Sequence, residues 1–169
     1  MLRKITPILF LFTVVFSSCS KDDNEEVSPA GLEGTWSNAG IDLIVDAKVY
    51  PVTVQALEDN YYTNSTYEFK SDGTFVFTDF EGDVFGGSYT YDTSGNTVKL
   101  DVDGESITYL VKIDGSSLVL SSPTIDLNKE ETTDEEDLVL LSFFFLSIDQ
   151  EGDIEGEGDA ISIDYKFTK

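Results

Sequence analysis

The chain of 169 residues has a formal net charge of −23 at neutral pH, because 33 aspartates and glutamates stand against 10 lysines and arginines. It contains no histidine, and after Cys19 it contains neither arginine nor a second cysteine. This composition excludes Ser-His-Asp and Cys-His catalysis, histidine–zinc sites and arginine phosphate clamps. The acidic surface should repel nucleic acid and favour cations or basic partners, although solubility alone is a sufficient reason for it.

Residues 1–18 have the pattern of a secretory signal peptide. Arg3 and Lys4 give a basic start, residues 8–16 form an apolar run interrupted only by Thr13, and two small serines follow. The run is too short for a membrane span, which needs roughly 20 apolar residues. The order of positive charge, apolar run and small residues therefore predicts export.

Cys19 directly follows this segment and cannot form an internal disulfide. The sequence Phe16-Ser17-Ser18-Cys19 resembles the lipobox of bacterial lipoproteins, with phenylalanine in place of the commoner leucine. The resemblance implies that the signal is cut before Cys19 and that the cysteine carries lipid. Acyl chains would then hold the protein at a membrane, since each buried CH₂ contributes roughly 0.8 kcal/mol.

Residues 19–30 lack an apolar pattern and are interpreted as a flexible acidic tether. Within it, Lys21, Asp22 and Asp23 resemble the surface-export signal of Bacteroidetes lipoproteins, which implies lipid-anchored display on the outer membrane at the cell surface. An ordinary solvated tether is the alternative.

From residue 33 onward, apolar and polar residues alternate, and turn residues recur at regular intervals. The alternation is clearest at 66–70, 74–78 and 107–113, and Asp103-Gly104 is a strong hairpin signal. About ten strand candidates paired in chain order predict an all-β, up-and-down antiparallel barrel of about 8–10 strands, which removes its own edges. A two-sheet sandwich fits the same pattern. Residues 31–169 are assigned to this one domain.

Two stretches break the alternation. From Ile41 to Leu57 the apolar positions shift by one residue beside Pro51, which predicts one bent strand with a bulge or corner. The segment 138–148, LVLLSFFFLSI, is apolar on both faces, which predicts a strand covered by a loop or by a partner. The preceding charge run, 128–137, is predicted to be a loop.

The stretch Gly31-Leu32-Glu33-Gly34-Thr35-Trp36 contains a Gly-x-Trp motif that resembles the lipocalin signature. Together with the hairpin Tyr67–Phe75 and the strand Gly87–Tyr91, it looks like the lipocalin-like domains of Bacteroidetes lipoproteins. The resemblance implies that Trp36 packs across the closed end of the barrel and that the interior binds a small molecule or lipid, although barrels host many functions. The arginine that usually backs the lipocalin tryptophan is absent, and residues 122–159 have no counterpart.

The lengths of the connections predict where the barrel opens. In an up-and-down meander, successive connections alternate between the two ends. Three tight turns then share one end: 71–73, 93–96 and 114–116. Three long loops share the other end: 58–65, 80–85 and 122–137. Binding sites gather on long loops, so the mouth is expected there, although the long loop 149–159 falls on the tight side.

Inward or rim aromatic residues are the candidate ligand contacts: Tyr61, Tyr62, Phe75, Phe77, Phe80, Phe85, Tyr89, Tyr91 and Tyr109.

Asp153, Glu155 and Glu157 occupy alternate positions in a glycine-rich acidic stretch that imitates half of a calcium loop. The flanks are expected to be strands rather than helices, so the stretch predicts weak Ca²⁺ binding or a plain solvated loop. No other cofactor is expected.

Together these features predict an outer-membrane, surface-exposed lipoprotein whose barrel binds a small apolar or amphiphilic ligand. The alternative is a filled barrel that binds a protein partner or cations through its acidic loops or through Phe143–Phe145. A carboxylate-based hydrolase is the third interpretation, and no pattern marks a catalytic pair. The interior volume separates the first two, because an eight-stranded barrel is just wide enough to be filled or to hold one small ligand.

Overall fold

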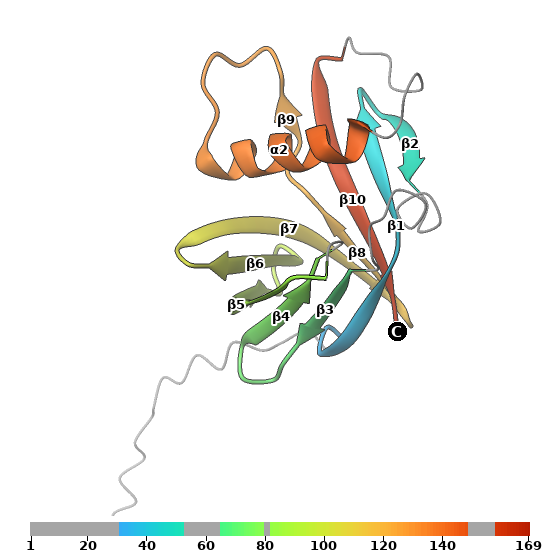
Figure 1. Cartoon of the computed structure of the whole chain (residues 1–169), viewed down its shortest axis with the longest axis vertical. Helices are drawn as coiled ribbons and strands as arrows, with labels where there is room; N and C mark the ends of the chain where they lie inside the picture. Colours follow the sequence, from blue (N-terminus) through green and yellow to red (C-terminus); the bar gives the residue numbers. More distant parts are fainter. Residues whose placement is uncertain (1–30, 53–64, 80–81, 149–157) are drawn as a thin grey trace, which may run out of the picture.

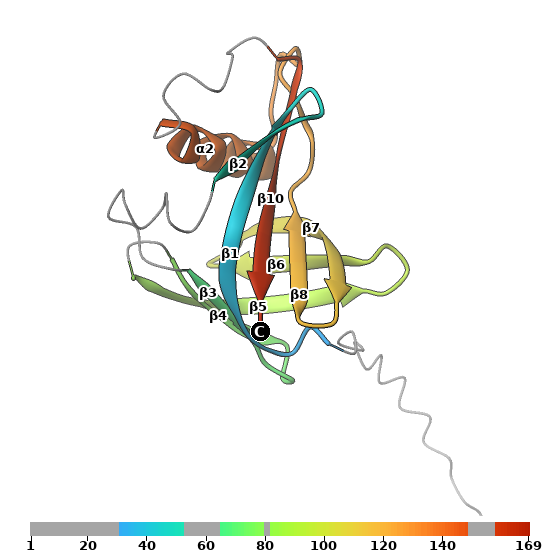
Figure 2. The same cartoon turned by 90° about the vertical axis from the view of Figure 1, so that its right-hand side faces the viewer.

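The computed structural model describes residues 31–52, 65–79, 82–148 and 158–169. In these ranges the chain forms strands and one helix, shown in Figure 1 and, turned by 90°, in Figure 2. The elements are β1 (Gly34–Val45), β2 (Lys48–Val52), β3 (Thr66–Phe69), β4 (Thr74–Thr78), β5 (Val84–Asp92), β6 (Thr97–Val102), β7 (Glu105–Asp114), β8 (Ser117–Ser121), β9 (Ile125–Asp126), α2 (Asp134–Ile148) and β10 (Ala160–Thr168).

Eight strands close into an antiparallel barrel, in the order β1-β3-β4-β5-β6-β7-β8-β10, with β10 pairing back onto β1. The predicted all-β up-and-down barrel is therefore confirmed, and the closed pairing excludes the two-sheet sandwich. The three tight turns at 71–73, 93–96 and 114–116 share one end, called the closed end below. The connections 79–83 and 103–104 lie at the other end, called the mouth.

β1 and β10 are longer than their barrel neighbours and continue past the mouth. There β2 pairs with Ile41–Val45 of β1, and β9 pairs with Ala160 and Ile161 of β10. The resulting extension has its own apolar core, separate from the barrel core around Trp36. α2 supplies Val139 to this second core, and both views show the helix lying above β7 (Figures 1 and 2).

β1 and β2 form a hairpin, so the prediction of one bent strand over Ile41–Leu57 is wrong. Asp46 and Ala47, between the two strands, have φ values of 47° and 67°, and a two-residue type I′ turn needs positive φ at both central positions. The turn, and not a bulge beside Pro51, causes the one-residue shift in the apolar pattern. The Asp46 carboxylate also accepts a hydrogen bond from the Ala160 N–H at 2.9 Å, which joins this turn to β10.

Residues 134–148 form a helix, so the predicted strand over 138–148 is wrong, as is the last part of the predicted loop over 128–137. Residues 138–148 are apolar on every face of the helix, so they lack the 3.6-residue apolar stripe that identifies a half-buried helix. Val139 is buried, whereas Leu141, Phe144 and Phe145 are exposed.

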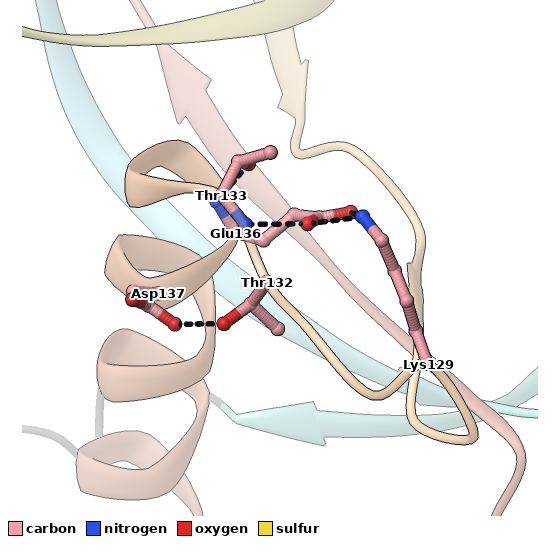
Figure 3. A network of polar contacts seen from close by, with 5 residues as sticks. All are labelled: Lys129, Thr132, Thr133, Glu136 and Asp137. Atoms are coloured by element: carbon pink, nitrogen blue, oxygen red, sulfur yellow. Dashed lines mark hydrogen bonds and ion pairs between the residues drawn. The ribbon is translucent and has the colours of Figure 1, made fainter.

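The start of α2 carries a signal that the sequence analysis missed, drawn in Figure 3. Thr133 N–H donates to the Glu136 carboxylate at 2.8 Å, and Glu136 N–H donates to the Thr133 hydroxyl at 3.2 Å, a reciprocal capping box. Lys129 adds an ion pair to Glu136 at 2.7 Å. Four acidic residues in the first turn favour this end of the helix, because the helix dipole is positive there.

Trp36 is fully buried, and its indole N–H donates to the Leu32 carbonyl oxygen at 2.7 Å. The Lys169 ammonium lies 4.2 Å from the centroid of the Trp36 ring. It also donates to the carbonyl oxygens of Gly31 and Glu33, at 2.8 and 2.7 Å. Lys169, which is far from Trp36 in the sequence, therefore packs against the tryptophan ring. It takes the place of the arginine that usually packs there in lipocalins and that this sequence lacks.

Lys169→Met is expected to lower the free energy of unfolding by about 1–2 kcal/mol, because it removes a cation–π contact and two charged hydrogen bonds. Lys166→Met is the control, since Lys166 forms a surface ion pair with Asp42 at 2.6 Å, and such pairs contribute about 0–1 kcal/mol. Trp36 is the only tryptophan, so urea unfolding followed by its emission measures both variants. An equal loss in both would mean that Lys169 contributes only as a surface charge.

Candidate ligand cavity

Two adjoining cavities lie at the mouth, between the barrel and α2. The smaller has a volume of about 280 Å³ and is lined by Ser65, Tyr67, Phe77, Asp79, Tyr109, Ser142, Phe145, Leu146 and Tyr165. The larger has a volume of about 500 Å³ and is lined by Tyr67, Phe75, Phe77, Phe85, Leu100, Val102, Asp103, Glu105, Ser106, Ile107 and Leu138. Both have Tyr67 and Phe77 in their walls. Ligand sites in proteins commonly measure roughly 300–1,000 Å³, so the space suits one small molecule.

The shortness of β8 explains why the barrel has room here. β8 pairs with β7 only over Leu110–Asp114, and with β10 only over Asp164–Thr168. Nearer the mouth, β7 has no described strand partner on that side, and α2 lies beside it instead. The Thr108 N–H of β7 donates to the Glu135 carboxylate of α2, so the helix satisfies a backbone group that a longer β8 would have paired.

Stacked and edge-on aromatic pairs hold the cavity walls in place. The Tyr67 and Phe77 rings stack with centroids 4.5 Å apart, and the Phe167 ring meets Tyr67 edge-on at 5.4 Å. Tyr109 and Tyr165 meet edge-on at 5.9 Å. Such pairs add about 0.5–1.5 kcal/mol each beyond the burial of their area, so they stabilise the packing of these walls.

The three cavity tyrosines are uncharged at physiological pH. Burial raises the pKa of Tyr165 to about 12, against a hydrogen bond with Ser142 that acts in the opposite direction. Burial, and then repulsion from neighbouring phenols, also raises the pKa of Tyr67 and of Tyr109. A raised pKa means that the neutral phenol is favoured, so these hydroxyls offer hydrogen bonds and no charge.

Four of the predicted ligand contacts line the cavities: Phe75, Phe77, Phe85 and Tyr109. Tyr89 and Tyr91 line neither of them. The Tyr89 hydroxyl donates to the Lys70 carbonyl oxygen at 2.8 Å, and the Tyr91 hydroxyl donates to the Asn96 side chain at 3.2 Å, both at the closed end. Tyr61, Tyr62 and Phe80 lie outside the described residues.

Tyr67 and Tyr165 also line the cavities. Both lie at inward positions of the alternation, Tyr67 with Phe69 and Tyr165 with Phe167. Ser142, Phe145 and Leu146 could not be found in this way, because the segment was interpreted as a strand.

The other predicted sites fall outside the described residues: Cys19, Lys21, Asp22, Asp23, Asp153, Glu155 and Glu157. Within the described ranges, no group of three or more His, Cys, Asp or Glu side chains is placed to hold a metal ion. No helix in the same ranges has the length and apolar character needed to cross a bilayer.

Fold and cavities together define an antiparallel barrel with a helix at its mouth and two open cavities between them. No protein-family model matches the chain, and no curated protein matches it. A similar solved structure is that of a DUF4847 family protein from Bacteroides vulgatus ATCC 8482. The two share 14% sequence identity with a TM-score of 0.44, over 80% of this chain and 92% of that one. Values this low do not carry a function from one protein to the other.

Proposed function

We propose that this protein is a lipid-anchored barrel protein of the outer membrane, displayed at the cell surface, that binds a small apolar or amphiphilic ligand beneath α2. The observation that supports ligand binding is the pair of open cavities at the mouth, of about 280 and 500 Å³, which are walled by aromatic rings. A barrel packed solid by its own side chains would favour the filled-barrel alternative. The lipocalin-like motifs around Trp36 agree with this proposal.

The position of the closed end supports the anchoring geometry. The Gly31 carbonyl oxygen accepts a hydrogen bond from Lys169 at that end, and residues 19–30 directly precede Gly31. Twelve residues span at most about 40 Å when fully extended. A lipid on Cys19 would therefore attach the barrel by its closed end and leave the mouth free to face away from the membrane.

Cys19→Ala is expected to abolish labelling with radioactive palmitate and to release the protein from the membrane fraction. Joint alanine replacement of Lys21, Asp22 and Asp23 is the control, which should retain the label and lose exposure to protease added to whole cells. Unchanged labelling of Cys19→Ala would refute the anchor. Equal protease cleavage of the wild type and the triple variant would mean that residues 21–23 act only as part of a tether and not as an export signal.

Ser142→Phe is expected to weaken binding of the neutral dye N-phenyl-1-naphthylamine at least tenfold, because the new ring enters the smaller cavity from α2. Ser147→Phe is the matched control on the same helix, since Ser147 lines neither cavity and its hydroxyl donates to the Phe144 carbonyl oxygen on the exposed side. Fluorescence titration of the chain from residue 20 onward, which keeps every described residue, measures both. Equal affinities in the two variants would place the dye elsewhere.

A surface interaction protein remains the second candidate, and one observation favours it. Leu141, Phe144 and Phe145 of α2 are each more than half exposed, at 54, 59 and 54%. Exposed aromatic residues on one helix are typical of contact surfaces. If the wild-type chain binds no apolar dye and the cavity variants behave alike, this candidate gains support at the expense of the first.

A further inference from the structure

A third cavity adjoins the larger one, between the β6–β7 turn and the start of α2, which lie close together in Figure 1. Its volume is about 570 Å³, and its wall shares Glu105, Ser106 and Leu138 with the wall of the larger cavity. The hydrogen bond from the Thr108 N–H of β7 to the Glu135 carboxylate holds the helix start beside the strand. A ligand in the larger cavity therefore has a second space next to it.

The two spaces have walls of opposite character. Aromatic and aliphatic side chains such as Phe75, Phe77 and Ile107 form most of the larger cavity, and its charged lining residues are Asp103 and Glu105. The third cavity is lined by four carboxylates and by two leucines: Glu105, Asp134, Glu135, Asp137, Leu138 and Leu141. An apolar space thus ends in an acidic one, which is the arrangement that an amphiphile requires.

Helix stability explains only some of these carboxylates. Asp134, Glu135 and Asp137 belong to the first turn of α2, where the helix dipole favours negative charge. Asp103 and Glu105 come from the β6–β7 turn and cap no helix. Asparagine would adopt the positive φ at residue 103 as well as aspartate does, so the turn itself does not require a charge there.

The negative charge at the third cavity is not neutralised by basic side chains of the described residues. No described lysine lines any of the three cavities, and none forms an ion pair with the carboxylates that line the third. Lys129, near the helix start, pairs instead with Glu136, which lines none of them. The positive end of the α2 dipole is equivalent to only about half a unit charge, so the four carboxylates outweigh it.

This distribution of charge discriminates among amphiphiles by their head groups. A carboxylate or phosphate head would meet like charges, and a neutral head would gain no ion pair. An ammonium head would be attracted by the carboxylates, and the faces of the aromatic rings also attract cations. The same apolar chain should therefore bind most tightly when it carries a positive charge.

We propose that the larger cavity takes a cationic amphiphile, whose apolar chain lies between the aromatic walls and whose ammonium group lies beside Glu105, where the third cavity begins. The inference rests on the proposed function, because it names the ligand class for the same site. Asp103 and Glu105 are then the residues that select the head group.

Three probes with the same eight-carbon chain test this by displacing N-phenyl-1-naphthylamine from the chain from residue 20 onward: octylammonium, 1-octanol and octanoate. At neutral pH and low ionic strength, the wild type should bind octylammonium about tenfold more tightly than octanol, and octanoate most weakly. One exposed ion pair changes an affinity by at most about fivefold, so this preference needs more than one carboxylate. Joint replacement Asp103→Asn and Glu105→Gln should reduce the preference to about threefold or less and leave octanol binding unchanged.

Glu68→Gln together with Asp114→Asn is the matched control, because it removes two exposed carboxylates that line none of the cavities. It should keep the tenfold preference. If no probe displaces the dye, the proposed function fails. If octanol or octanoate binds the wild type as tightly as octylammonium, the cavity binds ligands but the inference about the head group is overturned. An equal loss of preference in both double variants would also overturn it, since the attraction would then come from the charge of the whole protein.

Discussion

Gly87→Ala is expected to lower the free energy of unfolding by about 3 kcal/mol, in the upper part of the range for overpacked interiors. A Cβ atom at this position would overlap the Asp101 carbonyl oxygen and would lie 2.8 Å from Cε1 of the Phe75 ring. The first obstacle is backbone of β6 and cannot rotate away. The second is directly opposite, since Phe75 of β4 pairs with Gly87 of β5. Because Phe75 lines the larger cavity, displacing its ring should also weaken dye binding.

Gly86→Ala is the matched control for this prediction. A Cβ atom at residue 86 would have the Phe75 carbonyl oxygen as its nearest neighbour, at 3.8 Å, which is an ordinary van der Waals contact. The stability should then change by no more than about 0.5 kcal/mol. Urea unfolding followed by Trp36 emission compares the two variants under the same conditions. Equal midpoints would show that the sheet relaxes around residue 87 and that the close approach of Phe75 is not required.

Val139→Asp is expected to cost about 3 kcal/mol or more and to abolish dye binding. Val139 is 1% exposed and packs in the extension core with strand residues such as Leu43 and Ile163. An unpaired carboxylate buried there is strongly unfavourable, so α2 should leave the sheet. Ser142, Phe145 and Leu146 would leave with it, and the smaller cavity would lose its helical wall.

Phe144→Asp introduces the same charge on the same helix at a side chain that is 59% exposed. It should therefore retain both stability and dye binding. Urea unfolding gives the stability, and fluorescence titration gives the affinity. If Val139→Asp still binds the dye as the wild type does, α2 is no part of the site. If only Phe144→Asp loses a protein partner, the exposed face of α2 is the contact surface.

The sequence alone determined the strands of the barrel and most of their turns. Alternation with a period of two specifies which face of each strand is buried, and this pattern is local. Asp103-Gly104 was expected to form a hairpin, and both residues have the positive φ that such a turn needs, 55° and 91°. Inward positions such as Phe75, Phe77, Tyr109 and Tyr165 followed from the same alternation.

Only the tertiary structure decided the features that depend on distant parts of the chain. Residues 138–148 are apolar on every side and carry no period of their own, so packing on the extension core and the cap at Thr133 decide that they form a helix. Lys169 meets Trp36 because the barrel closes, and no local pattern relates two residues so far apart. The cavity itself exists because β8 ends early and α2 takes its place beside β7. Local periodicity reports which way a side chain faces, whereas the space it faces depends on how all the strands and the helix meet.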